Sequence, residues 1–279
     1  MNPLGYSQEK KFTVSVAPSY SNTNLSWSIA GNIEGTSPNI LSEVKYYNIL
    51  VFDPSMKLVY RGVRNLEFSL GFQKGWTLGG KVSDRDFAED NRTALTYDET
   101  FDSNKGWVNG LSIGGSYYFL NSENFLVRGH LIFNNEVQRY YSLKDEIPNL
   151  KTTYQTNRKA VLLGLGGVYS IGEKVKIPLD IFYSLNRITS EANWNLIEAF
   201  QHPLSFQHFA DGNGYSMDLG VEHQLNQIIS TYFNLEINSF NTRAGIDKVF
   251  FKTGEIEKTR LNGIHYFKKQ ISFGVKMNF

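Results

Sequence analysis

The sequence predicts an all-β protein, a ten-stranded antiparallel transmembrane β-barrel. Three observations lead to this prediction. Apolar and polar residues alternate with a period of two along most of the chain, which is typical of strands that separate two different environments. Short turns alternate with long loops, as in outer-membrane barrels. No apolar run approaches the length of about 18 residues that a transmembrane helix needs.

The composition narrows the possible functions. The 279 residues carry a net charge of +1, so no overall field attracts nucleic acid, and no nucleic-acid partner is expected. The absence of cysteine excludes disulfides and cysteine-based metal or redox sites. The first ten residues, MNPLGYSQEK, contain no apolar core of a signal peptide. Together with the barrel pattern, this favours a mature chain from which a signal has been removed over a cytoplasmic protein.

The strand pattern places charges on the polar faces. Phe68, Leu70 and Phe72 alternate with polar or small residues, and Met217, Leu219 and Val221 do the same further along the chain. The polar faces carry charged residues such as Glu67, Arg128, His130, Asp180, Asp218, Glu222 and Glu236. A soluble β-sandwich permits the same alternation, so the connections between strands have to distinguish the two folds.

The connections favour the barrel. Short turns are expected at 53–55, 121–124, 171–173 and near 226, and long outer loops near 30–40, 77–105, 144–156, 190–213 and 249–263. Four turns and five loops connect ten strands, and an even number puts both termini on the periplasmic side. The expected organisation is therefore a periplasmic segment over 1–10 and a single barrel over 11–279.

The last strand supports the same prediction. Ile271, Phe273, Val275 and Met277 are expected to face lipid, while the residues between them face the lumen. The strand is expected to close the barrel against 12–16, with Phe279 at the periplasmic interface. This ending resembles the C-terminal signal that the barrel-assembly machinery recognises, so that machinery is an expected partner during biogenesis.

Residues 42–107 carry a family resemblance. The segments SEVKY at 42–46, GGKVSDRDF at 79–87 and FDSNKGW at 101–107 stand in the order and spacing of strands two to four of the omptins. The sequence therefore resembles the omptins, ten-stranded aspartyl endopeptidases of the Gram-negative outer membrane. The resemblance implies an outer-membrane location, contact with lipid and lipopolysaccharide, and a peptide or protein substrate at the cell surface.

The resemblance also implies four catalytic residues. In omptins an Asp-x-Asp pair and an Asp-x-His pair activate a water molecule, and Asp84 and Asp86 match the first pair. Residues two apart in an extended strand project to one face, where two carboxylates can share a proton. His202 and His208 are the candidates for the second pair, but each is preceded two positions earlier by phenylalanine. Glu198 and Asp211 are the nearest acids in the chain. An acidic grip for a basic substrate side chain has no counterpart before Glu34.

Three functions remain open. The first is an omptin-like hydrolase that uses Asp84, Asp86 and either His202 or His208. The second is a non-catalytic barrel of the same fold, acting as a surface adhesin, a scaffold or a structural protein. The third is a narrow channel, which side chains filling a ten-stranded barrel make less favourable. No cofactor and no metal site are expected, because the two histidines lack a third ligand and the acidic loop lacks an EF-hand pattern.

Overall fold

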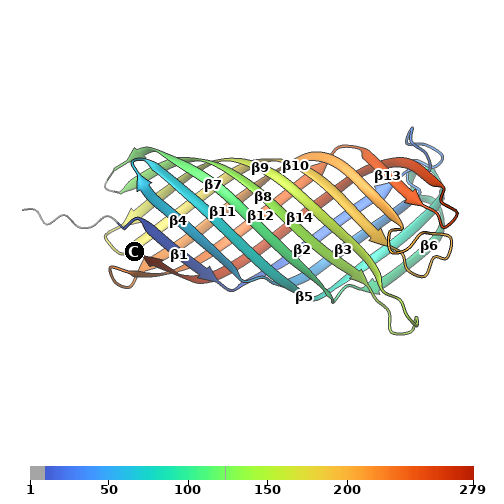
Figure 1. Cartoon of the computed structure of the whole chain (residues 1–279), viewed down its shortest axis with the longest axis horizontal. Coiled ribbons are helices and arrows are strands. Elements are labelled where there is room, and N and C mark those ends of the chain that lie inside the picture. Colours follow the sequence, from blue (N-terminus) through green and yellow to red (C-terminus); the bar gives the residue numbers. More distant parts are fainter. Residues whose placement is uncertain (1–9, 123) are drawn as a thin grey trace, which may run out of the picture.

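Fourteen strand segments form one closed antiparallel sheet in the computed structural model, which describes residues 10–122 and 124–279 (Figure 1). The sheet closes because β1 pairs with β14 and β5 pairs with β7. The segments are β1 (Phe12–Ala17), β2 (Ser19–Ile29), β3 (Ser42–Phe52), β4 (Ser55–Val63), β5 (Leu66–Glu89), β6 (Thr93–Asp102), β7 (Gly106–Asn121), β8 (Phe125–Ser142), β9 (Thr152–Ile171), β10 (Val175–Asn193), β11 (Phe206–Gln224), β12 (Ile229–Thr242), β13 (Gly245–Phe250) and β14 (Ile256–Asn278). A single 3-10 turn, η1 (Asp90–Arg92), connects β5 to β6.

These segments make up ten barrel-crossing strands, as the sequence predicts. Segments β1 and β2 form one crossing strand interrupted at Pro18, and β3 and β4 form another interrupted at Asp53 and Pro54, because β1 pairs with β4 and β2 pairs with β3. Segments β6 and β13 extend the crossing strands β7 and β12 toward the long loops after short interruptions: β5 pairs with both β6 and β7, and β13, like β12, lies between β11 and β14. The remaining eight segments each cross the barrel once.

The prediction of a turn at 53–55 is wrong. Both β3 and β4 run antiparallel to β5, with Ser42 opposite Asp86 and Ser55 opposite Gln73, so the chain keeps its direction through this point. Proline has no N–H to donate to the ladder, which explains the interruption. The chain reverses instead at 64–65, where Asn65 adopts a positive φ of 59°.

The outward face of the barrel is an apolar band. Alternate residues on neighbouring strands expose large apolar side chains, including Ile113 (56% exposed), Leu165 (65%) and Phe273 (60%). In water such a surface would be unfavourable, whereas in a bilayer it faces hydrocarbon. Among the described residues, no helix has the length and apolar character needed to cross a membrane.

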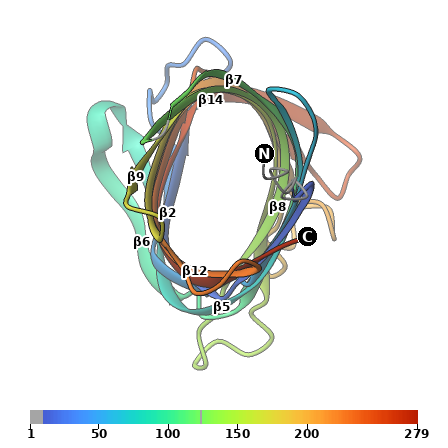
Figure 2. The ribbon, with the colours of Figure 1, turned by 90° about the vertical axis from the view of Figure 1, so that its left-hand side faces the viewer.

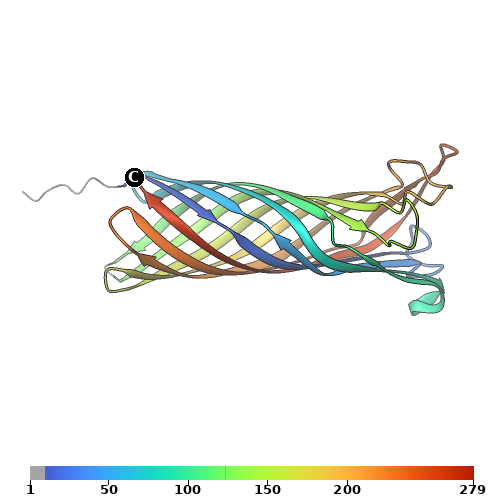
Figure 3. The ribbon, with the colours of Figure 1, turned by 90° about the horizontal axis from the view of Figure 1, so that it is seen from below.

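The two ends of the barrel differ. At one end the described chain termini meet, with Phe12 N–H bonding Phe279 C=O at 3.1 Å and Phe279 N–H bonding Phe12 C=O at 2.8 Å. This pairing agrees with the expected closure of the last strand against the first. Short connections occupy this end and long ones the other (Figure 3). Strands reach far into the ranges expected as loops, since β5 continues to Glu89 and β11 begins at Phe206.

Residues 1–9, most of the expected periplasmic segment, lie outside the described part of the chain. The end-on view in Figure 2 shows the oval cross-section that the strands enclose. The side chains inside the barrel decide which functions it can support. They differ between the half nearer the short turns (the turn half) and the half nearer the long loops (the loop half).

An ion-pair network fills the half of the lumen nearer the short turns. Arg128 lies between Asp180, at 2.9 Å, and Glu67, at 3.7 Å. Glu67 also accepts bonds from Arg61, at 2.8 Å, and from the Tyr118 hydroxyl, at 2.6 Å. Since an unpaired charge in a narrow lumen loses its hydration without compensation, mutual pairing is the arrangement that keeps these charges inside.

Aromatic side chains fill the half nearer the loops. We call this layer the aromatic plug and define it as Trp27, Tyr46, Tyr140, Tyr154, Trp194 and Phe206. Tyr46 stacks on Tyr154 with ring centroids 6.0 Å apart, and Trp27 stacks on Tyr154 at 5.6 Å. All members except the partly exposed Trp194 are buried. The rings of the plug pack on one another inside the loop half of the barrel.

The ion-pair network predicts a large difference between two arginines. Arg128→Met removes the cation shared by Glu67 and Asp180 and is expected to lower the free energy of unfolding by about 3 kcal/mol or more. Arg187→Met is the matched control, because its bond to Asp211 lies on the outer surface, where water screens the pair, so a much smaller loss is expected. Urea unfolding in detergent, followed by tryptophan fluorescence, measures both. Equal losses in the two variants would contradict the assigned role of the network.

Candidate functional site at the loop end of the barrel

The acid pair of the sequence resemblance lies at the mouth of the barrel. Asp84 and Asp86 are on β5, six or more residues beyond Leu78, the last large exposed apolar residue of that strand. Six residues of strand span roughly 20 Å, so the pair stands clear of the apolar band. Both side chains are half-buried and share the inward face with buried Val82. The predicted common orientation of the two carboxylates is therefore present.

Burial and mutual repulsion change the acidity of this pair. Burial, reinforced by the negative charge of Asp86, raises the pKa of Asp84 from 3.8 to about 7, while a hydrogen bond from the Trp194 side chain opposes the rise. Burial also raises the pKa of Asp86, against a hydrogen bond with Ser42. Neither carboxylate forms an ion pair with any side chain in the described part of the protein. The pair can therefore hold a proton near neutral pH or attract a cation.

His208 also faces inward, but its side chain is enclosed by rings of the aromatic plug. Its Nδ1 is 3.0 Å from the Tyr154 hydroxyl, and its Nε2 is 3.3 Å from Oδ1 of Asp247. Asp247 is on β13, directly opposite His208 in the strand register, and its other oxygen accepts a bond from the Thr259 hydroxyl at 3.0 Å. Asp247 is therefore the carboxylate nearest to the imidazole, and it comes from a neighbouring strand. The contact is not a hydrogen bond, because Nε2 of His208 and Oδ1 of Asp247 both lack a hydrogen-bond partner among the described atoms.

Asp247 is the residue that the sequence interpretation missed. Asp211, the nearest acid to His208 along the chain, instead faces outward and bonds Arg187 at 2.9 Å. The available signal was the short alternating stretch GIDKVF at 245–250, which forms β13 and places its acid on the inward face. The pairing itself depends on strand register, which a local pattern does not contain.

His202 occupies a different place. It lies in the loop between β10 and β11, where its Nδ1 bonds the Asn193 side-chain oxygen at 2.8 Å. Together with Glu198 and Lys252 it lines an open hollow of about 600 Å³ between this loop and the one after β13. His202 and Glu198 thus share a hollow, but no bond between them is present among the described side chains.

Aromatic rings separate the acid pair from His208. The Trp27 ring packs against the His208 imidazole with centroids 4.7 Å apart, and Phe206 packs against the same imidazole at 5.1 Å. Trp194, whose side chain opposes the rise in the pKa of Asp84, lies 4.7 Å from Phe206 and 6.4 Å from Trp27 between ring centroids. Within the described residues, no hydrogen bond or ion pair connects either histidine to Asp84 or Asp86. The four candidates therefore do not form one directly bonded constellation.

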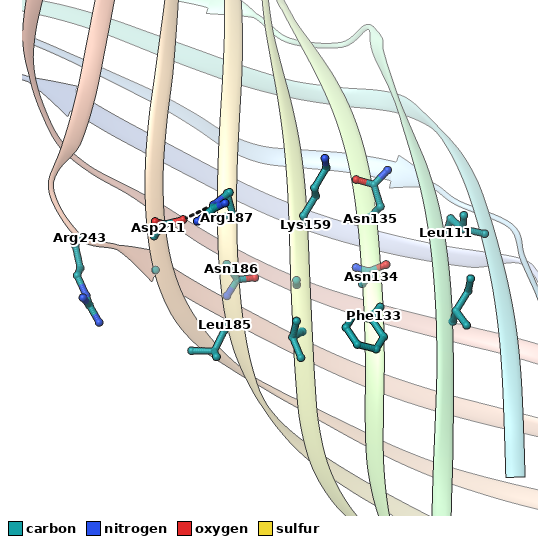
Figure 4. A pocket seen from close by; sticks show the side chains of 14 residues that line it. Leu111, Phe133, Asn134, Asn135, Lys159, Leu185, Asn186, Arg187, Asp211 and Arg243 are labelled. Carbon is teal, nitrogen blue, oxygen red and sulfur yellow. Dashed lines mark hydrogen bonds and ion pairs between the residues drawn. The ribbon is translucent and has the colours of Figure 1, made fainter.

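A basic groove lies on the outward face, just above the apolar band. Lys159, Arg187 and Arg243 line a groove of about 640 Å³ whose lower border is apolar, with Phe133 and Leu185 among its residues (Figure 4). Of the three cations, Arg187 is bonded to Asp211, as the dashed line in Figure 4 marks. Cations directly above lipid-facing side chains are at the level of lipid headgroups.

No arrangement suited to a metal ion stands out in residues 10–122 and 124–279, where no three or more histidine, aspartate or glutamate side chains converge. The chemistry available to the loop end is therefore built from the half-buried acid pair, the buried His208 with its two partners, and the outward basic groove.

A family model matches residues 15–279, nearly the whole described chain, and it describes the Protochlamydia outer membrane protein (Pom). The chain belongs to the Pom family. No curated protein sequence matches it. This Pom-family barrel resembles the crystal structure of the outer membrane protease OmpT from Escherichia coli, with a TM-score of 0.78, 12% sequence identity, and coverage of 96% of this chain and 97% of that chain. At this identity, the likeness establishes the fold.

Two other barrels match this Pom-family chain at lower structural similarity. The translocator domain of the autotransporter NalP from Neisseria meningitidis has a TM-score of 0.43 and 9% identity, covering 95% of this chain and 88% of that one. The outer membrane protein OprG from Pseudomonas aeruginosa has a TM-score of 0.42 and 10% identity, with 96% coverage of each chain. The family and the OmpT-like fold establish an outer-membrane β-barrel of Gram-negative bacteria. In such barrels the long loops are expected at the outer end.

The acid pair predicts a pH dependence of stability. Because the pKa of Asp84 is raised in the folded barrel, its favourable contribution is fully present below its ordinary value of 3.8 and is lost as the pH rises through about 7. Asp84→Asn is therefore expected to flatten the fall in unfolding free energy between these two pH values. Asp98→Asn, on the outer face of the same hairpin, is the matched control. Parallel pH curves for wild type and Asp84→Asn would refute the assigned acidity.

Proposed function

We propose that this protein is a non-catalytic outer-membrane barrel whose outer loops form a binding surface for a partner outside the cell. The proposal takes up the second function left open by the sequence. It is carried by the packing around His208, whose side chain is 0% exposed. Trp27 and Phe206 cover the imidazole. A peptide bond cannot reach a base that is enclosed by packed rings, because proton transfer requires hydrogen-bond contact directly or through one water molecule.

The same packing opposes a channel. The aromatic plug fills the outer half of the lumen, and the ion pairs of Arg128, Glu67 and Asp180 occupy the other half. A solute would have to displace both. The exposed loops and hairpins at the outer end are therefore the parts of the described protein that are available for contact with other molecules.

A hydrolase with Asp84, Asp86 and His208 is the second candidate. One observation favours it: the Asp247 carboxylate lies 3.3 Å from Nε2 of His208, where it would pair with a protonated imidazole, and the Tyr154 hydroxyl lies 3.0 Å from the other ring nitrogen. The raised pKa of Asp84, about 7, suits an acid that shares a proton with its neighbour. This candidate requires Trp27 to move so that the acid pair and His208 face a common space. His202, bonded to Asn193 in the outer loop, is the less favoured base.

A cleavage experiment separates the two candidates. Protein refolded in detergent with lipopolysaccharide is incubated with an unbiased peptide library, and the products are identified by mass spectrometry. No cleavage is expected from the wild type or from the Asp84→Asn, Asp86→Asn double variant. Cleavage by the wild type that the double variant lacks would overturn the non-catalytic proposal in favour of the hydrolase.

A Trp27→Ala variant sharpens the experiment. If Trp27 merely covers an otherwise competent site, its removal produces cleavage that a further His208→Asn change abolishes. If Trp27→Ala remains inactive while it retains the heat-modifiable mobility of a folded barrel, the proposal of a binding barrel is strengthened.

The basic groove supports lipopolysaccharide as the lipid partner. The cations Lys159, Arg187 and Arg243 stand above apolar side chains at headgroup level, where phosphate groups and acyl chains of one lipid can be contacted together. Hydrogen bonds to charged groups contribute about 1.5–3 kcal/mol each. The geometry thus fits a phosphorylated lipid at this face of the barrel.

Binding measurements test the groove. Alanine at all three cations is expected to weaken lipopolysaccharide binding at least about tenfold. Alanine at Lys174 and Lys176, at the opposite end of β10, is the matched control and leaves binding unchanged. Dephosphorylated lipopolysaccharide should bind the wild type as weakly as the native lipid binds the triple variant. Equal affinity of the triple variant and wild type for the native lipid would remove the groove as the site.

A further inference from the structure

The hairpin of β5 and β6 has an unpaired edge. Strand β5 pairs with β3 on one side and with β6 on the other, whereas β6 has no strand partner besides β5 in the described sheet. Only the base of β6 is covered, where Asp102 and Leu143 form an isolated bridge. Figure 2 shows β6 standing away from the barrel wall. The edge between 93 and 101 therefore lies open above the membrane.

The direction of the free backbone groups follows from that bridge. Asp102 bonds Leu143 through both its N–H and its C=O, each at 2.8 Å, so these groups point away from β5. Groups in an antiparallel strand alternate, so the N–H and C=O of Thr100 and Asp98 point to the same open side. All six residues of 93–98 are exposed. An exposed row of backbone donors and acceptors is a template for another strand.

The hairpin is held in place from its other side. At the tip, the side chain of Asp90 accepts a bond from Asn39 N–H at 2.7 Å, and the Asn39 side chain accepts one from Asn91 N–H at 2.8 Å. Arg92 adds an ion pair to buried Glu43 at 2.7 Å. These contacts fix the hairpin to the first outer loop and to β3 and leave the β6 edge untouched. A strand that is already ordered binds with a smaller entropic cost.

The charge of the hairpin specifies the kind of segment that fits. Residues 84–102 carry seven carboxylates against two guanidinium groups. On the inward face, Asp84 is directly opposite Glu99, and Asp86 is opposite Tyr97. Like charges opposite each other on a sheet are unfavourable. Lys144 bonds Glu99 at 2.7 Å, while Asp84 and Asp86 have no ion-pair partner among the described residues. Further positive charge on this face would relieve the repulsion.

We propose that the open edge of β6 binds an extended basic segment of a partner protein, which joins the hairpin as an additional strand. Every second side chain of the added strand lies on the face that carries Tyr97 and Glu99, because strand side chains alternate. Lysine or arginine at those positions is then next to Glu99, and the acid pair on β5 lies one strand further away, about 10 Å across the same face. The added strand forms backbone hydrogen bonds with Thr100 and Asp98, as in other complexes in which a peptide joins the exposed edge of a sheet. A second copy of this acidic hairpin would repel the first. The inference rests on the proposed binding function and names its partner.

The experiment uses synthetic peptides and the whole barrel in detergent. The probe is a ten-residue peptide of alternating lysine and valine. One control replaces lysine by glutamate, and a second carries N-methyl groups on alternate amides, which keeps the charge but prevents strand pairing. Affinity is measured by fluorescence anisotropy at two salt concentrations, and hydrogen–deuterium exchange reports on 93–101. The expected result is binding of the lysine peptide, at least tenfold weaker binding of both controls, and slowed exchange in β6.

Protein variants supply the complementary arm. Thr100→Pro removes one backbone donor from the open edge and is expected to weaken binding of the lysine peptide at least tenfold. Thr253→Pro, in the exposed loop after β13, is the control and is expected to leave this binding unchanged. The methylated peptide keeps the experiment decisive if Thr100→Pro does not fold. Equal binding of methylated and unmethylated peptides, or unchanged exchange in β6, would overturn the proposal. So would dimerisation of the barrel through this edge in analytical ultracentrifugation. Mass spectrometry of the recovered peptide distinguishes a failure of the proposed function from a failure of this inference. A cleaved peptide counts against the non-catalytic function, and an intact peptide that does not bind counts against the β6 edge as a binding site.

Discussion

The structure depends on one constraint: within a bilayer, each backbone N–H and C=O must find its partner inside the protein. A closed antiparallel ladder meets this condition, and here it does so through the pairing of the first strand segment with the last. Closure then creates an interior that must be filled. In this chain the turn half is filled with paired charges and the loop half with aromatic rings, so the requirement for backbone pairing ultimately produces a barrel with a packed core. Only above the membrane, where water can satisfy the backbone, does the sheet leave an edge open.

Local alternation together with the order of short turns and long loops was sufficient to predict the barrel, but these patterns could not place all of its interruptions. Asp53 and Pro54 have the composition of a turn, and the sequence suggested one there, yet the ladder to β5 continues on both sides of them. Local turn propensity was outweighed by the pairing of two long strands. The same limitation hid β6 and β13, whose residues look like polar loop when their partners are unknown.

The candidate site was predictable only in part, for a related reason. The common face of Asp84 and Asp86 follows from strand periodicity alone. The register of two strands brings together His208 and Asp247, which are 39 positions apart in the chain, with Nε2 and Oδ1 3.3 Å from each other. No periodicity in a single sequence contains that register. The covering of His208 by Trp27 likewise connects distant parts of the chain and became visible only once the barrel had closed.

The two proline interruptions have a consequence for how the barrel opens. Pro18 and Pro54 lie in neighbouring crossing strands at the same level, since Ala17 pairs with Ser55 just below them and Tyr20 pairs with Phe52 just above. Two adjacent strands therefore lack a ladder donor at one height, next to the seam where the last strand meets the first. Local unfolding begins where the fewest bonds must break together. The two prolines therefore place a weak point in the wall of the cylinder beside this seam, at a height where two neighbouring strands each lack one donor.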